Sequence, residues 1–240
     1  MGNEHGEWIM RGVGENDPCR LRSAEELAAY VEEVGFLPLF RNKVPGFSVE
    51  ERTVPNRWWT DDPDSDPWEW RKVLAAGGKV AYGKFFDKKA GFLSLRWLPY
   101  FVNVRRDGYD FDALWEDGKT SHRCKKIMDL FTGGEERFSN EVRRLAGFGG
   151  EGERNFEGTV TALQMQTYLV VRDFRCRINR QGVAYGWPIA VYATPESIWG
   201  YDAVTAAYGE PPAVSRQRLY EQMKRLWPEA TERQMRKLLG

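Results

Sequence analysis

The spacing of apolar residues near the start of the chain predicts an amphipathic helix. Residues 23–36, SAEELAAYVEEVGF, begin with Ser23 and Glu26 at the spacing of a capping box and reach Gly35, a common helix-ending residue. One face of this helix carries four apolar or aromatic side chains, Leu27, Tyr30, Val31 and Val34.

A second helix, DPWEWRKVLAAGG, is predicted after a proline-rich irregular stretch. Asp66 is its expected N-cap and Pro67 its first position, where a missing N–H leaves no hydrogen bond unmade. The segments KVAYGKFF and GFLSLRWLPYF follow, separated by the polar letters DKKA. This pattern predicts two strands joined by a short turn.

Three helices and a hairpin are predicted between residues 120 and 193. The helices are TSHRCKKIMDLF, a short capped helix SNEVRRLAGFG from Ser139, and FEGTVTALQMQ, which places Phe156, Val160 and Leu163 inward. The strands YLVVRDFRCRI and VAYGWPIAVYA flank the turn NRQG, which contains Gly182. This is the element order of a winged helix-turn-helix, in which the third helix enters the DNA major groove and the hairpin, or wing, contacts the backbone or minor groove.

Three further helices are predicted beyond residue 193, with Thr194, Ser215 and Thr231 as their N-caps. The expected fold class is therefore α+β, a winged helix-turn-helix with C-terminal helices. We expect a disordered tail over 1–22, a helix-plus-hairpin unit over 23–115, the winged helix over 116–194 and a helical segment over 195–240. A tandem arrangement, with 23–115 as a degenerate winged helix, is an open alternative.

Composition indicates a globular protein, with 29% charged and 42% apolar residues. No apolar run approaches the length of a membrane span, and the first twenty residues lack the apolar core of a signal peptide. The three cysteines form no C-x-x-C pair, which favours a reducing cytoplasm. His5 and His122 are the only histidines, and no nucleotide-binding or nucleophile motif occurs, so neither a metal nor a cofactor is expected.

A zero net charge hides an uneven distribution. Residues 1–70 hold 15 acidic and 7 basic side chains, so the remaining 170 residues hold 20 acidic and 28 basic ones. A basic C-terminal two-thirds suits a polyanion, and double-stranded DNA is the expected partner. Solvated helix faces are the alternative explanation.

The predicted wing concentrates this positive charge. Arg175 and Arg177 lie two apart on a strand and share a face, so they could pair with successive phosphates. A strand edge guarded by charge is the alternative. The full set of expected DNA contacts adds residues of the wing and of the preceding helices: Lys125, Lys126, Thr159, Thr161, Arg172 and Arg180, with Arg143 and Arg144 as an extension.

The segment WWTDDPDSDPWEW combines four tryptophans with alternating aspartates. It imitates the start of a calcium loop, but Pro67 stands where that loop needs glycine and Val73 where it needs glutamate, so an EF-hand is rejected. The tryptophans could stack on an extruded base beside a carboxylate that steers a water. The alternative is a capped helix with tryptophans in the core or its lid.

Gln164 and Gln166 flank Met165 where the third helix gives way to a strand. Within a helix, residues two apart diverge by about 200°, whereas in a strand they share a face, so the pair could be reactive, base-reading or ordinary surface residues. FEGTVTALQMQTYLVVRDF, together with DPWEWRKVLAAGGKVAYGKFFDKKAGF, resembles the AlkZ-related proteins. These are short relatives of the AlkZ winged-helix DNA glycosylases, which unhook interstrand crosslinks and excise alkylated bases.

The resemblance runs from about residue 24 to the C-terminus. The catalytic signature of the glycosylase family is two glutamines around one apolar residue, and QMQ at 164–166 has that form, although the family's own motif lies near the N-terminus of longer chains. The resemblance implies a DNA-binding protein, and a monofunctional glycosylase for damaged bases if Gln164 and Gln166 orient the attacking water. The main alternative is a non-catalytic winged-helix regulator or protein-interaction module. In a third hypothesis the wings serve only as folding units.

Overall fold

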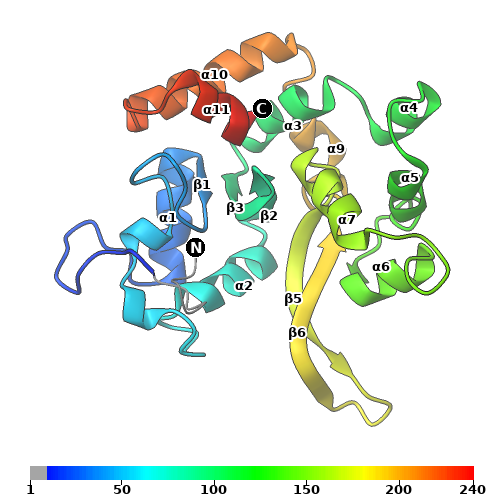
Figure 1. The fold of residues 1–240 in the computed structure, drawn as a ribbon, viewed down its shortest axis with the longest axis horizontal. Coiled ribbons are helices and arrows are strands. Elements are labelled where there is room, and N and C mark those ends of the chain that lie inside the picture. The colour runs from blue at the N-terminus through cyan, green and yellow to red at the C-terminus, as the bar shows by residue number, and fades with distance from the viewer. Residues whose placement is uncertain (1–9) are drawn as a thin grey trace.

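The computed structural model describes residues 10–240, in which helices surround two small antiparallel sheets (Figure 1). The predicted α+β class is confirmed. The first sheet has the order β1–β3–β2 and consists of β1 (Phe36–Pro38), β2 (Val80–Phe86) and β3 (Lys89–Ser94). The second has the order β4–β6–β5 and consists of β4 (Arg137–Phe138), β5 (Val170–Ile178) and β6 (Ala184–Ala193). In both sheets the last strand lies between the first two.

The first two predicted helices form where their capping residues place them. Helix α1 (Ala24–Val34) begins after Ser23, whose side chain accepts a hydrogen bond from the Glu26 N–H. Helix α2 (Pro67–Gly77) begins after Asp66, whose carboxylate accepts from the Trp68 N–H. Between β1 and α2 the chain makes only two short 3-10 turns, η1 (Glu50–Arg52) and η2 (Pro55–Arg57).

The first hairpin is tighter and ends sooner than its sequence predicts. Asp87 and Lys88 alone form the turn, both with positive φ (48° and 66°), as two-residue hairpin loops require. Strand β3 ends at Ser94, and the last four residues of GFLSLRWLPYF are the first four of helix α3 (Leu98–Arg106). Pro99 explains the correction, because proline cannot donate to a strand ladder but fits the first turn of a helix. Helix α4 (Phe111–Glu116) follows and was not predicted.

The second half contains the predicted helices α5 (His122–Met128), α6 (Ser139–Leu145) and α7 (Phe156–Met165), and then the predicted hairpin of β5 and β6. Strand β4 was not predicted. It lies directly before α6, so Phe138 rather than Ser139 is the N-cap of that helix.

The C-terminal segment forms α8 (Pro195–Trp199), α9 (Tyr201–Val204), α10 (Pro212–Leu226) and α11 (Glu232–Leu239). Thr194 and Thr231 are N-caps, as predicted. Ser215 is not: α10 begins earlier, after Pro211, and the buried Ser215 hydroxyl hydrogen-bonds to Asn103 and Glu210 instead.

Residues 10–22 contact the rest of the chain and are not the disordered tail that the sequence predicts over 1–22; residues 1–9 lie outside the described part of the chain. The Val13 N–H donates to the Thr53 carbonyl, and the Leu21 N–H donates to the Arg52 carbonyl. Gly12 lies so close to the Thr53 carbonyl that a Cβ atom would clash with it. Met10 and Leu21 are buried, so this segment adds to the core.

The two sheets belong to one continuous core that extends from Met10 to Leu239. Their helices pack reciprocally: α2 contacts β5 of the second sheet, α7 contacts β2 of the first, and β2 contacts β5. The C-terminal helices return to the first half of the chain, with α10 on α3 and α11 on β2 (Figure 1).

Candidate nucleic-acid interface

The β5–β6 hairpin extends well beyond the sheet that anchors it (Figure 1). Strand β4 pairs only with Val191 and Tyr192, so the rest of β6 has no third strand beside it. Burial follows the same division, because both strands are buried at the base and largely exposed toward the turn. Pro188 lies on this open stretch of β6, where a missing N–H interrupts no ladder. Residues 175–189 therefore form a two-stranded arm, the hairpin arm.

The tip of the hairpin arm is a well-defined turn. The Gly182 N–H donates to the Asn179 carbonyl, and Gly182 has a positive φ of 80°, which glycine adopts without strain. The Asn179 side-chain oxygen accepts from the N–H groups of Gln181 and Val183. The sequence NRQG thus fixes the reversal locally, as predicted.

The hairpin arm exposes several large apolar and aromatic side chains, which the surfaces of monomeric proteins rarely group together. The exposed fractions are 83% for Trp187, 69% for Ile178, 57% for Val183 and 45% for Tyr185. The Arg177 guanidinium lies 4.9 Å from the centre of the Tyr185 ring, its partner on the opposite strand. Such an exposed apolar group, beside basic residues, indicates a binding surface.

Two of the four hairpin arginines have hydrogen-bond and ion-pair partners within the protein. Arg172 donates to the carbonyls of Ala75 and Ala76 at the end of α2 and pairs with Glu136 (3.2 Å). Arg175 pairs with Asp173 (2.5 Å) and Glu136 (2.6 Å), and these carboxylates, Asp173 first, raise the pKa of Arg175. Both arginines join the hairpin base to its neighbours.

Arg177 and Arg180 differ from them. Neither forms an ion pair with any residue in the described range, and both are exposed. They lie on the hairpin arm, Arg180 in the turn itself. Of the four arginines predicted to contact DNA, these two have exposed charges without a carboxylate partner among the described residues.

The predicted contacts on α5 and the extension on α6 divide in the same way. Lys125 pairs with Asp129, and Lys126 pairs with Glu153 (2.9 Å). Arg143 and Arg144 are exposed and have no carboxylate partner among residues 10–240. Helix α6 contacts β6, so these two arginines extend the positive charge near the hairpin base.

Helix α7, the predicted recognition helix, faces the first sheet. Thr159 and Thr161 are buried, with 6% and 8% of their surface exposed. The Thr159 hydroxyl donates to the Asn155 carbonyl within its own helix, and the Thr161 hydroxyl accepts from the Lys84 ammonium of β2 (3.2 Å). In this arrangement neither threonine presents itself to a DNA groove.

The two glutamines lie in different surroundings. Gln164 is 1% exposed, and its Oε1 accepts from the Lys84 N–H (2.8 Å). Lys84 lies where the register of β2 shifts, and a Cβ atom at Gly83 would lie only 3.2 Å from Gln164 Oε1. Gln166 is the C-cap of α7; it is half-buried, and its side chain makes no hydrogen bond within the described residues. The structure therefore does not bring the two amides to one point.

Replacing Gln164 with Ala is expected to lower the free energy of unfolding by about 1–3 kcal/mol, because it removes a buried side chain and leaves the Lys84 N–H without its acceptor. The Gln166→Ala variant is the matched control and should change stability by less than about 0.5 kcal/mol. Urea titrations followed by tryptophan fluorescence measure both. Equal effects of the two substitutions would contradict this assignment.

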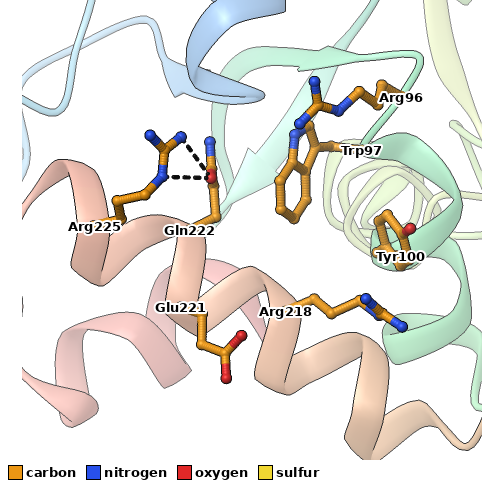
Figure 2. Close-up of a pocket in the computed structure, with 7 residues that line it drawn as sticks. All are labelled: Arg96, Trp97, Tyr100, Arg218, Glu221, Gln222 and Arg225. Carbon is orange, nitrogen blue, oxygen red and sulfur yellow. Dashed lines mark hydrogen bonds between the residues drawn. The ribbon is translucent and has the colours of Figure 1, made fainter.

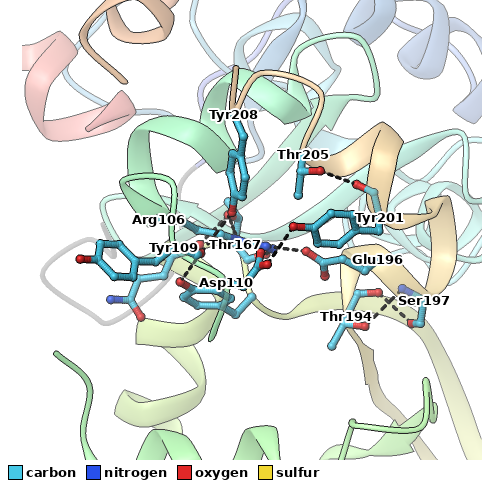
Figure 3. A network of polar contacts seen from close by, with 12 residues as sticks. Arg106, Tyr109, Asp110, Thr167, Thr194, Glu196, Ser197, Tyr201, Thr205 and Tyr208 are labelled. Carbon is cyan, nitrogen blue, oxygen red and sulfur yellow. Dashed lines mark hydrogen bonds and ion pairs between the residues drawn. The ribbon is translucent and has the colours of Figure 1, made fainter. Parts of the chain in front are cut away.

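Thr167, directly after the glutamines, is fully buried and lies within a network of polar contacts (Figure 3). Its φ is +64°, a value that a β-branched residue rarely adopts. The Arg106 guanidinium holds it there by donating to the Thr167 carbonyl (2.7 Å) and hydroxyl (3.3 Å). Arg106 also pairs with Glu196 of α8 (2.5 Å) and lies 4.4 Å from the Tyr168 ring centre. Burial alone would lower the pKa of Arg106, but the charge and hydrogen bond of Glu196 raise it overall.

This network was not found from the sequence. Arg106 ends α3, whose first residues, 98–101, belong to the predicted strand and whose remainder has no predicted element; Glu196 follows the hairpin by only three residues. Tyr168 and Tyr208 complete it by donating to the Tyr109 carbonyl. The positive φ at Thr167 could not be predicted from the sequence, because glycine or asparagine is the usual residue at such a φ and this position holds threonine.

The tryptophan-rich segment is built into the first half of the core. Asp66 is fully buried and accepts from the N–H groups of Thr60 and Asp61 as well as capping α2. Trp58 and Trp70 are buried, while Trp59 is 45% exposed. A capped helix with tryptophans in the core and its lid accounts for these positions.

Two other features are absent from residues 10–240. No helix there has both the length and the apolar character that a membrane span needs. Within the same residues, no three histidine, cysteine or acidic side chains gather in a way that could hold a metal ion.

Comparison with known proteins gives one result at the level of the family. The family model described as AlkZ related matches residues 21–240. No curated protein and no solved structure matches the chain. The match covers both sheets and all the helices from α1 to α11, so it includes the hairpin arm and the glutamines. The chain therefore belongs to the AlkZ-related family.

Proposed function

We propose that this protein binds duplex DNA through the hairpin arm and that each of its two halves is a winged helix. The order α5, β4, α6, α7, β5, β6, with sheet order β4–β6–β5, supports a winged helix in the second half. The first half repeats the order as α1, β1, α2, β2, β3, with 3-10 turns in place of its middle helix. The two units pack through their third helices and second strands.

This packing supports the hairpin arm, and not a helix, as the proposed DNA contact. Because α2 and α7 each cover a strand of the other unit, neither is free to lie in a major groove. The hairpin arm carries the contact instead. Arg177 and Arg180 neutralise phosphates, and the exposed Trp187 and Ile178 supply the apolar wedge with which many proteins enter a minor groove. The observation that carries the proposal is the presence of unpaired arginines and an exposed tryptophan on one projecting ribbon.

Fluorescence anisotropy of a labelled duplex at several salt concentrations tests the proposal. The double variant Arg177→Gln/Arg180→Gln is expected to bind more weakly than the unaltered protein and to show a salt dependence reduced by about two counterions. The control Arg233→Gln/Arg236→Gln removes the same charge from exposed positions on α11 and should bind like the unaltered protein.

Two results would contradict the proposal. One is a duplex affinity that does not change with salt, and the other is equal loss in both double variants. Either would favour the alternative, a protein-interaction module whose partner contacts the apolar side chains of the hairpin arm, Ile178, Val183, Tyr185 and Trp187.

Removal of damaged bases is the enzymatic form of this proposal. Of the glutamine pair, Gln166 is the residue whose amide is available, since the Gln164 oxygen is bound to the backbone of β2. An amide acts by orienting a water and stabilising charge, so it must lie close to the sugar. Base release from alkylated and crosslinked duplexes, compared between the unaltered protein and Gln166→Ala, measures this activity. Release that persists unchanged in Gln166→Ala would remove the glutamine from the mechanism.

A further inference from the structure

We propose that a groove between α3 and α10 is a second binding site, for a nucleotide that carries a 5′-phosphate. Two adjoining hollows, each of about 320 Å³, share Arg96 and Tyr100 and together form this groove. It lies at the end of the molecule opposite to the hairpin arm (Figure 1). The site is thus separate from the proposed duplex contact and goes beyond that function.

One half of the groove is basic (Figure 2). Arg96, Arg218 and Arg225 line it, and Arg96 has no carboxylate partner among the described residues. Arg225 donates to the amide oxygen of Gln222 (2.9 and 3.3 Å). Gln222 is itself fixed, because it is buried and its Nε2 donates to the Val34 carbonyl (2.8 Å). Arg225 is therefore held in place without its charge being neutralised.

Two carboxylates belong to the groove, Glu221 in this half and Glu210 in the other. Glu221 points away from Arg218 and Tyr100 in Figure 2, and it accepts a hydrogen bond from Gln217 (2.9 Å). Glu210 accepts from Ser215 (2.7 Å) and pairs with Arg218 (3.2 Å). Arg96 and Arg225 are left as unneutralised cations, one from each side of the groove. Guanidinium groups bind phosphate oxygens with two parallel hydrogen bonds, so this pair suits a terminal phosphate.

The other half of the groove is lined mostly by small and apolar residues, with Arg96 and Glu210 as its charged residues. Pro99, Ala206, Ala207 and Gly209 leave room beside the half-buried Tyr100 ring. A flat ring can stack on such an aromatic side chain, as nucleobases do on tyrosine. A single nucleotide would occupy both halves, with its phosphate in the basic half and its base in the apolar half. The ligand is either a free mononucleotide or the 5′-terminal nucleotide of a DNA strand.

Isothermal titration calorimetry with deoxyadenosine 5′-monophosphate tests the site in the full chain. Arg96→Gln and Arg225→Gln are each expected to weaken binding about 10- to 100-fold, the usual effect of losing a charge-assisted hydrogen bond. Both positions are exposed, so circular dichroism should be unchanged. Ala206→Phe fills the apolar half and should weaken binding of the nucleotide but not of inorganic phosphate. Arg233→Gln, on an exposed face of α11, is the control and should bind normally.

Comparison of 5′-phosphorylated with 5′-hydroxyl single strands distinguishes the two sources. Preference for the phosphorylated strand over the free nucleotide assigns the site to DNA ends, and the reverse assigns it to a free metabolite. Arg177→Gln/Arg180→Gln should keep nucleotide binding, so failure of the duplex proposal leaves this test intact. The proposal is overturned if no nucleotide binds at millimolar concentration, if inorganic phosphate binds as tightly, or if the Arg96 and Arg225 variants bind normally.

Discussion

Replacing Arg106 with Met is expected to lower the free energy of unfolding by about 3–5 kcal/mol. The substitution keeps a long side chain but removes the guanidinium. Glu196 then loses its ion-pair partner, and the strained Thr167 loses the two hydrogen bonds that hold its backbone and hydroxyl. Because Thr167 is fully buried and Arg106 is only 3% exposed, water cannot replace the contacts to Thr167, whereas the Glu196 side chain is 25% exposed and keeps part of its hydration.

Urea unfolding followed by circular dichroism measures this loss. The matched control is Arg236→Met, which breaks an ion pair with Glu232 in which both side chains are more than two-thirds exposed. Such surface pairs contribute between 0 and about 1 kcal/mol. If the two variants were equally stable, the buried network would not hold the junction between α7 and β5.

Replacing Trp187 with Ala is expected to weaken duplex binding by about 5- to 100-fold, the range measured when an aromatic side chain that stacks on a base is removed. The stability of the free protein should not change, because the indole is 83% exposed and packs on little. The variant therefore separates binding from folding more cleanly than a substitution at the buried base of the hairpin. Anisotropy with the same labelled duplex measures the effect.

Trp59→Ala is the comparison variant, since Trp59 is the other strongly exposed tryptophan among residues 10–240. It should bind the duplex like the unaltered protein. Loss of binding at Trp59 with none at Trp187 would assign the contact to the tryptophan-rich segment and contradict the role given to the hairpin arm.

The elements that could be predicted from the sequence are those whose signals are local. Ser23, Asp66 and Thr231 cap helices because their own side chains reach N–H groups two or three residues away. Strands β1 and β4 have three and two residues, too few for a pattern. They become strands only because β3 and β6 pair with them, which is tertiary information.

The same distinction applies to the candidate site. The positive charge of the hairpin could be read from four arginines within nine residues, but which of them are free could not. Glu136 neutralises Arg172 and Arg175, although it lies more than thirty-five residues earlier in the chain. The burial of Gln164 was equally hidden, because the residue that binds it belongs to the other half of the chain.

The contact between Lys84 and Gln164 joins residues 80 positions apart and also constrains how the protein is made. At the usual pace of ribosomal synthesis, about 5–20 residues per second, roughly 4–16 seconds pass between the two residues. Throughout that interval the nascent first half exposes the face of β2 that α7 and β5 later cover. Contacts of such long range form slowly, and surface left open in this way invites aggregation. Translation of residues 85–164 is therefore the period in which a chaperone would protect this chain most.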